Sequence, residues 1–201
     1  DAAIELDGDA SFRHKERTYA ERSYKQLTSR ETAVKSANAA DYKGTIKYIE
    51  LDGDIGFLAA GGGGSLTCMD ALIKCGGRPS NYTEYSGNPS AEKVYELTKQ
   101  ILSKPGLRGL WIVGAIANFT RVDTTMDGIT RALIEAKPDF PIVVRRSGPF
   151  ETEGLEILRK AAKEHNLNMQ IFGKELPMTE SARIIADAAN NFRSEKTWAY
   201  S

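Results

Sequence analysis

Two stretches and one arginine carry the residue types best suited to binding a small anion. Residues 114–120 (Gly-Ala-Ile-Ala-Asn-Phe-Thr) offer backbone N–H groups, the amide of Asn118 and the hydroxyl of Thr120. The four glycines at 61–64 let backbone N–H groups approach an anion closely, because glycine has no side chain in the way. The guanidinium of Arg146 can grip a carboxylate through two parallel hydrogen bonds, which lysine cannot do. Together these groups predict a site for a small polycarboxylate or phosphate.

Each of these features also has a purely structural explanation. Asn118 and Thr120 would serve equally as caps of the helix that follows them. The glycines would serve equally to pack a helix tightly against a strand, and their spacing fits neither the dinucleotide fingerprint nor a P-loop. Arg145 and Arg146 point to opposite faces if their strand continues that far. One of them is therefore expected to bind the ligand, and the other to form a structural ion pair.

No catalytic acid–base pattern accompanies these residues in the sequence. His14 and His165 are far apart, and each is expected at the surface. Cys68 and Cys75 stand seven apart in a predicted helix, which separates them by about 10 Å, too far for a disulfide. They are expected to be reduced thiols, and the sequence shows no zinc pattern. The chain is therefore expected to hold a ligand for chemistry that is carried out elsewhere.

The composition argues against several classes of function. The 201 residues carry 27 basic and 27 acidic side chains, for a formal net charge of zero. No basic excess points to nucleic acid, and no polybasic run points to a membrane surface. No apolar segment approaches the roughly 20 residues that span a bilayer, and the N-terminus lacks a signal-peptide core. We expect a cytoplasmic protein that binds neither nucleic acid nor membranes.

Short apolar runs alternate with amphipathic segments from residue 46 onward. This alternation predicts an α/β fold with a doubly wound, mainly parallel sheet of the flavodoxin-like or Rossmann-like kind. The Asp52-Gly53 pair between the first two runs is a strong signal for a hairpin. Strands are predicted at 46–51, 54–58, 80–85, 110–113, 140–144 and 169–172, and helices at 66–74, 89–102, 121–136, 151–163 and 179–191.

Loops that follow parallel strands gather at one edge of such a sheet, where open α/β sheets bind their ligands. The helix after the second such loop is expected to start at Pro89, with Asn88 or Ser86 as its cap. Its N-terminus would be a further seat for an anion. The loops expected at this edge are 61–65, 86–90, 114–120, 145–150 and 173–178.

The two ends of the chain differ from this middle part. Residues 1–13 read as strand, Asp-Gly turn and strand, an abrupt start that suggests a piece of a longer protein. Residues 13–42 are highly charged and poor in apolar side chains, which predicts a linker, an arm that packs on something absent, or a solvated surface helix. The main domain is predicted at 43–192, and residues 193–201 form a tail without usable periodicity.

Four sequence motifs occur in order within this middle part. They are Ala-Gly-Gly-Gly-Gly-Ser at 60–65, Asn-Tyr-Thr-Glu-Tyr-Ser-Gly-Asn-Pro-Ser at 81–90, Gly-Ala-Ile-Ala-Asn-Phe-Thr at 114–120 and Val-Arg-Arg-Ser-Gly-Pro at 144–149. They resemble the ATP-citrate lyase family, in the part equivalent to the succinyl-CoA synthetase β subunit. The resemblance implies that family's CoA-ligase domain, preceded at 1–13 by the last hairpin of an ATP-grasp domain. Gly64, Asn88 and Ser147 depart slightly from the family pattern.

The resemblance also implies site residues. Asp1 would stand where the family places a magnesium-binding aspartate. Asn88, Pro89 and Ser90 would form the helix N-terminus that faces a phosphohistidine on a partner. The citrate contacts would fall on Gly62, Gly63, Ser86, Gly87, Asn118, Phe119, Thr120 and Arg146.

In the reaction that the resemblance implies, ATP phosphorylates a histidine, and the phosphoryl group passes to citrate. CoA then gives citryl-CoA, which is cleaved to acetyl-CoA and oxaloacetate. The histidine and a citrate-synthase-like domain belong to an α-like subunit, so a hetero-oligomer is implied and this chain alone is expected to be inactive. ATP, magnesium, CoA and citrate are the implied ligands.

Three alternatives stay open at this point. The chain could belong to a citryl-CoA synthetase, which stops at citryl-CoA. It could belong to a succinyl-CoA synthetase β subunit, although that branch carries glycines where Asn118, Phe119 and Thr120 stand. It could also be a non-catalytic oligomerising or ligand-sensing module.

Overall fold

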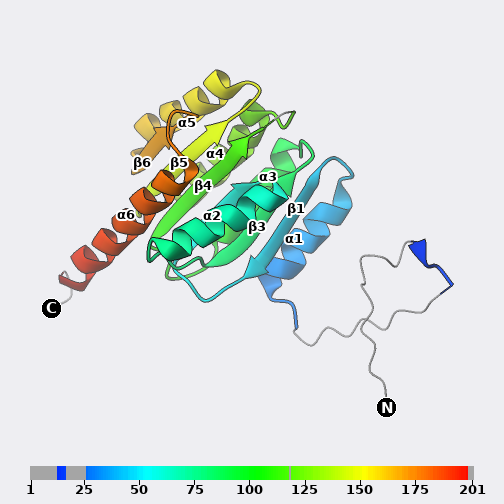
Figure 1. Ribbon diagram of the computed structural model, residues 1–201, viewed down its shortest axis with the longest axis horizontal. Helices are drawn as coiled ribbons and strands as arrows, with labels where there is room; N and C mark the ends of the chain where they lie inside the picture. Colours follow the sequence, from blue (N-terminus) through cyan, green and yellow to red (C-terminus); the bar gives the residue numbers. More distant parts are fainter. Residues whose placement is uncertain (1–12, 17–25, 118, 199–201) are drawn as a thin grey trace, which may run out of the picture.

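The computed structural model describes residues 13–16, 26–117 and 119–198. In these residues a six-stranded sheet lies between two layers of helices (Figure 1). Helices α2 and α6 cover one face, and α1, α3, α4 and α5 cover the other. The strands are β1 (Thr45–Glu50), β2 (Ile55–Ala60), β3 (Asn81–Ser86), β4 (Gly109–Ile116), β5 (Ile142–Ser147) and β6 (Met169–Phe172). The helices are α1 (Ser29–Ala40), α2 (Gly62–Lys74), α3 (Ala91–Leu102), α4 (Val122–Ala136), α5 (Glu151–His165) and α6 (Met178–Trp198).

The strand order confirms the predicted doubly wound, mainly parallel sheet. The order is β1-β3-β2-β4-β5-β6, in which β2 to β6 run parallel and only β1 is antiparallel to its neighbour. From β2 the chain first adds β3 on one side and then crosses over to add β4 on the other. This reversal creates a switch point at the carboxyl end of β2, where sheets of this kind bind ligands.

The predicted hairpin between the first two strands is wrong. β1 pairs with β3 and not with β2, so the Asp52-Gly53 pair lies in a longer crossing between strands that are not neighbours. The N–H of Gly53 donates to the carbonyl of Pro79 over 3.0 Å, and a Cβ on Gly53 would overlap the carbonyls of Arg78 and Pro79. Glycine is therefore required at position 53 because the backbone of residues 78–79 passes so close to it. The prediction had instead assumed that the glycine provides the positive φ of a tight turn.

Burial follows from the two helical layers. Every residue of β2 and β5 is buried, as expected for parallel strands covered on both faces. β1 at the sheet edge alternates between exposed and buried residues over most of its length. In α3 the apolar face of Val94, Leu97 and Ile101 is fully buried. The hydrophobic pattern was thus sufficient to place the inner strands.

Helix α1 packs on this sheet. It contacts β1 and α3, and its Val34 is buried in the core. A capping box starts it, in which Thr28 accepts from the N–H of Glu31 and Glu31 accepts from the N–H of Thr28. For this region the sequence predicted a linker, an arm that packs on something absent, or a solvated helix. Residues 29–40 instead form a helix that packs on the sheet of the same chain. The domain boundary at residue 42 stays a prediction.

Side chains of α1 cover the free edge of β1. Asn38 accepts from the N–H of Ile46 over 2.9 Å, and Glu31 accepts from the N–H of Glu50 over 3.0 Å. Arg30 pairs with Glu50 through two hydrogen bonds of 2.6 and 3.0 Å, which lowers the pKa of the Glu50 carboxyl. Polar side chains thus occupy donors that would otherwise template the pairing of another strand.

The turn between α1 and β1 is tied to the start of α3. Lys93 is buried, and its ammonium donates to the carbonyls of Asp41, Gly44 and Lys43 over 2.6, 2.9 and 3.4 Å. Ser90 donates to the carboxylate of Asp41 over 2.7 Å. This network holds the connection from α1 to β1 against the loop after β3.

Two predictions concern the ends of the chain. The predicted hairpin at residues 1–13, with Asp1, lies outside the described residues except for Arg13. The predicted tail at 193–201 begins inside a helix, because α6 extends to Trp198. Within the described part of the chain, no helix is both long enough and apolar enough to cross a membrane.

Gly128 lets α3 and α4 approach closely. A Cβ at this position would overlap the carbonyl of Ala91 in the first turn of α3. We expect Gly128→Ala to lower the free energy of unfolding by about 1–3 kcal/mol, because overpacking outweighs the gain in helix propensity of about 1 kcal/mol. Urea unfolding measures this effect. The exposed neighbour variant Asp127→Ala should stay within about 0.5 kcal/mol of the parent, and an equal or higher stability of Gly128→Ala would contradict the packing.

Candidate anion-binding site

The carboxyl ends of five parallel strands bring the predicted loops to one edge of the sheet. β2, β3, β4, β5 and β6 end here, followed by the loops predicted to carry the site. This edge holds Gly62, Gly63, Ser86, Gly87, Phe119, Thr120 and Arg146. Asn118 lies outside the described residues.

Arg146 is a fully buried cation with unused donors. Its residue has no exposed surface, and its Nε and Nη2 have no hydrogen-bond partner within the described part of the chain. Only Nη1 has one, the carbonyl of Ala115 at 3.4 Å. A buried donor without an acceptor costs about 1–3 kcal/mol, and more when it is charged. The unpaired atoms indicate that this guanidinium is arranged to receive an anionic ligand.

A bulge in β4 lies opposite Arg146. Val113 pairs with Arg145 and Ile116 pairs with Ser147, so two residues of β4 face the single residue 146 of β5. Bulges are rare between parallel strands and are frequent beside active sites, where they redirect side chains. The carbonyls of the two bulged residues, Gly114 and Ala115, each accept a hydrogen bond from an arginine side chain.

Arg145 and Arg146 occupy these two carbonyls from opposite faces. Nη1 of Arg145 donates to Gly114 over 2.8 Å, while Nη1 of Arg146 donates to Ala115. Nε of Arg145 donates to the carbonyl of Leu176 over 2.8 Å, and its Nη2 donates to the carbonyl of Lys174 over 3.5 Å. The predicted opposite orientation is therefore confirmed, because β5 continues to residue 147.

The expected ion pair of Arg145 is wrong. Its hydrogen-bond partners among the described residues are backbone carbonyls, and no carboxylate lies within ion-pair distance. Burial, and then the charge of Arg146, lower the pKa of the Arg145 guanidinium, which stays charged. Two adjacent buried cations thus leave a positive centre at the carboxyl end of β5.

Glycine at 114 makes room for the Arg146 guanidinium. A Cβ here would overlap Nη1 of Arg146 and lie 2.9 Å from the Cβ of Ala60 on β2. The ring of Tyr85 on β3 lies 5.7 Å from Cζ of Arg146, within range for a cation–π contact. The Arg146 side chain therefore reaches from β5 past β4 to the ring of Tyr85 on β3.

The glycine run forms the first turn of α2, whereas the sequence predicted a loop up to residue 65. Gly61 is the N-cap with φ 85°, and the first helical bond runs from the N–H of Ser65 to its carbonyl. The backbone N–H groups of Gly62, Gly63 and Gly64 lie ahead of that first bond in the sequence, so the helix itself gives them no carbonyl acceptor. A Cβ on Gly62 would press on the carboxylate of Glu84, whereas one on Gly63 would meet nothing within 4 Å. Tight packing accounts for the first of these glycines, and open access to N–H groups accounts for the second.

The starts of α3 and α4 differ from the predicted caps. Ser90 is the N-cap of α3 and accepts from the N–H of Lys93, so neither Ser86 nor Asn88 has that role. Arg121 is the N-cap of α4 and makes no side-chain cap bond. The alternative that Thr120 merely caps the next helix is therefore wrong.

Charge at this edge favours an anion. The helices that follow β2, β3, β4 and β5 start here, and each N-terminus carries partial positive charge from the peptide dipoles. Thr120 is largely buried beside them, and Phe119 is two-thirds exposed. His165 ends α5 and therefore lies at the opposite edge. Within the described residues no cluster of three or more metal-ligating side chains is present.

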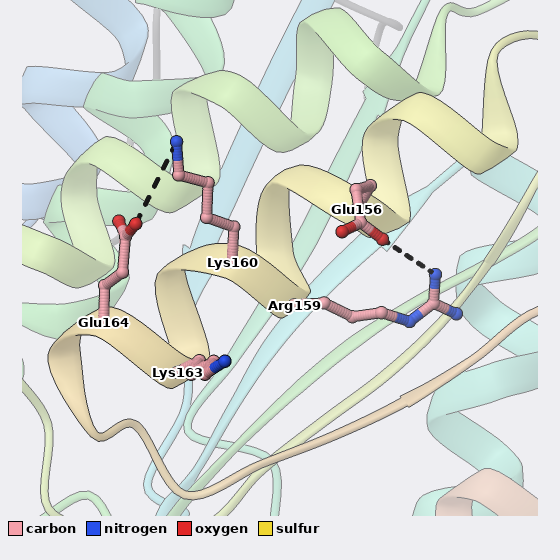
Figure 2. A pocket seen from close by; sticks show the side chains of 5 residues that line it. All are labelled: Glu156, Arg159, Lys160, Lys163 and Glu164. Atoms are coloured by element: carbon pink, nitrogen blue, oxygen red, sulfur yellow. Dashed lines mark ion pairs between the residues drawn. The ribbon is translucent and has the colours of Figure 1, made fainter.

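A separate charged pocket lies on α5 and does not belong to this edge. Figure 2 shows that its lining side chains all come from that helix, where Glu156 pairs with Arg159 at 3.8 Å and Lys160 with Glu164 at 3.9 Å. The fifth lining residue is Lys163. Such pairs within one exposed helix face contribute little energy and position no buried group.

Comparison with known proteins places this geometry in a family. The sequence model described as ATP citrate lyase citrate-binding matches residues 25–189. The chain is 38% identical over 174 residues to a probable ATP-citrate synthase of Caenorhabditis elegans, covering 77% of the chain and 15% of that protein. It is 34% identical over 160 residues to the succinate–CoA ligase [ADP-forming] subunit beta of Desulfurococcus amylolyticus, covering 79% and 39%.

Solved structures with a similar fold include members of the same family. The fold resembles ATP citrate lyase from Methanothrix soehngenii in complex with citrate and coenzyme A, with a TM-score of 0.78 and 29% identity, covering 90% of the chain and 52% of that structure. It equally resembles a mutant of Methanosaeta concilii ATP citrate lyase in complex with (3S)-citryl-CoA, with 31% identity over 89% of the chain and 49% of that structure. The chain spans about half or less of each of these proteins.

The two neighbouring arginines should respond in opposite ways to the same change. We expect Arg145→Met to lower the free energy of unfolding by at least about 2 kcal/mol, because three carbonyls lose a charged donor. Arg146→Met removes two buried donors that have no acceptor among the described residues and one long hydrogen bond of 3.4 Å to Ala115, so stability without ligand should be unchanged or higher by about 1–3 kcal/mol. Urea unfolding of the ligand-free chain tests both variants. A large loss of stability in Arg146→Met would show that its guanidinium is satisfied internally.

Proposed function

The chain belongs to the ATP citrate lyase citrate-binding family, and on that premise we propose that its strand-end site binds citrate. The observation that carries the proposal is the buried guanidinium of Arg146, whose Nε and Nη2 have no hydrogen-bond partner among the described residues. These two atoms form one side of the planar fork that matches the two oxygens of a carboxylate. Citrate would supply that carboxylate and leave two more for the surrounding helix N-termini.

The remaining contacts follow from the groups at the edge. The N–H groups of Gly62 and Gly63 in the first turn of α2 can donate to a second carboxylate. Thr120 and Asn118 are assigned to the hydroxyl and the third carboxylate. Ser86, Gly87 and Phe119 complete the proposed contacts. A polar pocket that pairs each of these groups would reject an acid that leaves some of them unpaired.

In the proposed reaction this chain positions citrate and contributes charge. One carboxylate is turned outward to a phosphohistidine on an α-like partner, near the start of α3 with Asn88, Pro89 and Ser90. Phosphoryl transfer then gives citryl phosphate and subsequently citryl-CoA, which the complete enzyme cleaves to acetyl-CoA and oxaloacetate. Positioning and charge stabilisation are most of what phosphoryl transfer requires from a protein.

ATP, magnesium and CoA belong to the proposed complete enzyme. Asp1, the residue assigned to magnesium, lies outside the described residues, and the described residues contain no metal-ligand cluster that fits the ion. We therefore derive no step of this chain through those groups. The proposed partner is an α-like subunit in a hetero-oligomer.

A second candidate function is that of a succinate–CoA ligase β subunit. The 34% identity to the Desulfurococcus protein supports it. The two functions differ in the ligand at the edge, because succinate lacks the third carboxylate and the hydroxyl of citrate. The largely buried hydroxyl of Thr120 favours the larger acid, since a buried polar group without a partner would oppose succinate.

Calorimetry of this chain with citrate and with succinate separates the candidates. We expect citrate to bind more tightly than succinate, and Arg146→Met to weaken citrate by at least about tenfold, the cost of a charged hydrogen-bond pair. Lys163→Met on α5 is the control and should leave citrate binding unchanged. Equal affinity for both acids would favour the ligase candidate, and citrate binding unaffected by Arg146→Met would contradict the proposed site.

A further inference from the structure

Asn88 links two loops across the switch point. Its Oδ1 accepts a hydrogen bond of 3.1 Å from the backbone N–H of Arg121. Asn88 belongs to the loop after β3 and Arg121 is the N-cap of α4, which follows β4. Because β2 lies between β3 and β4, this bond spans the place where the strand order reverses. It fixes the separation of two loops that the sheet itself does not join.

The same residue, Arg121, also meets the third loop. Its Cζ lies 4.0 Å from the centre of the Phe150 ring, in the loop after β5. Asp123 orients the guanidinium through hydrogen bonds of 3.0 and 2.5 Å. One residue further, the N–H of Val122 donates to the carbonyl of Pro149 over 2.9 Å. The start of α4 is therefore attached to loops on both sides.

Both outer members of this arrangement have left-handed backbone. Asn88 has φ 58° and Phe150 has φ 59°. Asparagine tolerates this region, but a bulky aromatic residue adopts it only where its surroundings hold it there. Phe150 is nearly half exposed, so core packing alone does not hold it, and the Arg121 guanidinium stacks on its ring. Strain of this kind is typical of segments that position a ligand.

We propose that Asn88, Arg121 and Phe150 form an inter-loop clasp that fixes the three ligand-facing loops relative to one another. Asn88 is then a positioning residue for the acid held at Arg146 and Thr120, because its side chain is already engaged by Arg121. This role differs from the one suggested by sequence, in which Asn88 belonged only to a helix N-terminus. The identity of the acid as citrate rests on the proposed function.

Asn88→Gly tests the clasp without adding strain, since glycine accepts a positive φ and removes only the side-chain acceptor. We expect hydrogen exchange of the Arg121 amide, followed by NMR on the whole chain, to become about threefold to tenfold faster. Citrate should bind about threefold to tenfold more weakly by calorimetry, the equivalent of one hydrogen bond. Asn88→Asp keeps an acceptor for the amide and should restore slow exchange.

Asn166→Gly is the matched control. Asn166 also has left-handed backbone, with φ 52°, but it is the C-cap of α5 at the opposite edge of the sheet. It should change neither the Arg121 amide nor citrate binding. Unchanged exchange in Asn88→Gly would overturn the clasp, and faster exchange with unaltered citrate affinity would overturn the positioning role of Asn88. If the parent chain binds no citrate, the proposed function fails, while the amide exchange of Asn88→Gly and Asn88→Asp still decides whether the clasp exists.

Discussion

Two adjacent arginine side chains of β5 donate to the backbone at the end of β4, where that strand carries a bulge. Arg145 donates to the carbonyl of Gly114 and Arg146 to that of Ala115, from the two faces of the sheet. Every guanidinium nitrogen of Arg145 has a carbonyl partner, whereas Nε and Nη2 of Arg146 have none within the described part of the chain. The two residues are identical and adjacent, yet only Arg146 keeps buried donors that the proposed ligand could use.

The helices around the bulge extend this asymmetry. Four helices begin at the edge, and their peptide dipoles add to the charge of Arg146. Among the described residues, no partner neutralises Nε and Nη2 of Arg146. An internal carboxylate beside Arg146 would stabilise the empty protein and would compete with any acid from solution. Under the proposed function this charge is left for the ligand, a trade between stability and function that is common in binding sites.

Hydrophobic periodicity was enough to predict the inner strands and the edge at which the loops meet, because β2, β4 and β5 contain apolar runs in a sheet that helices cover on both faces. It could not predict the partner of β1, because an Asp-Gly pair is compatible with a tight turn and also with a close crossing such as that of Gly53 past Pro79. The partners of Arg145 were not predicted because they are backbone carbonyls, and the spacing of side chains in the sequence does not indicate where such carbonyls lie. α1 was underestimated because its role depends on polar side chains such as Asn38 and Glu31 bonding to a strand edge.

The buried ammonium of Lys93 has a consequence for chemical labelling. With its hydrogens directed at the carbonyls of Asp41, Lys43 and Gly44, this amine offers no free lone pair and little surface to an acylating reagent. Lysines on the outer faces of the helices lack that protection. The extent of acylation at this one amine would therefore record whether the turn between α1 and β1 was docked on α3 at the moment the reagent was added.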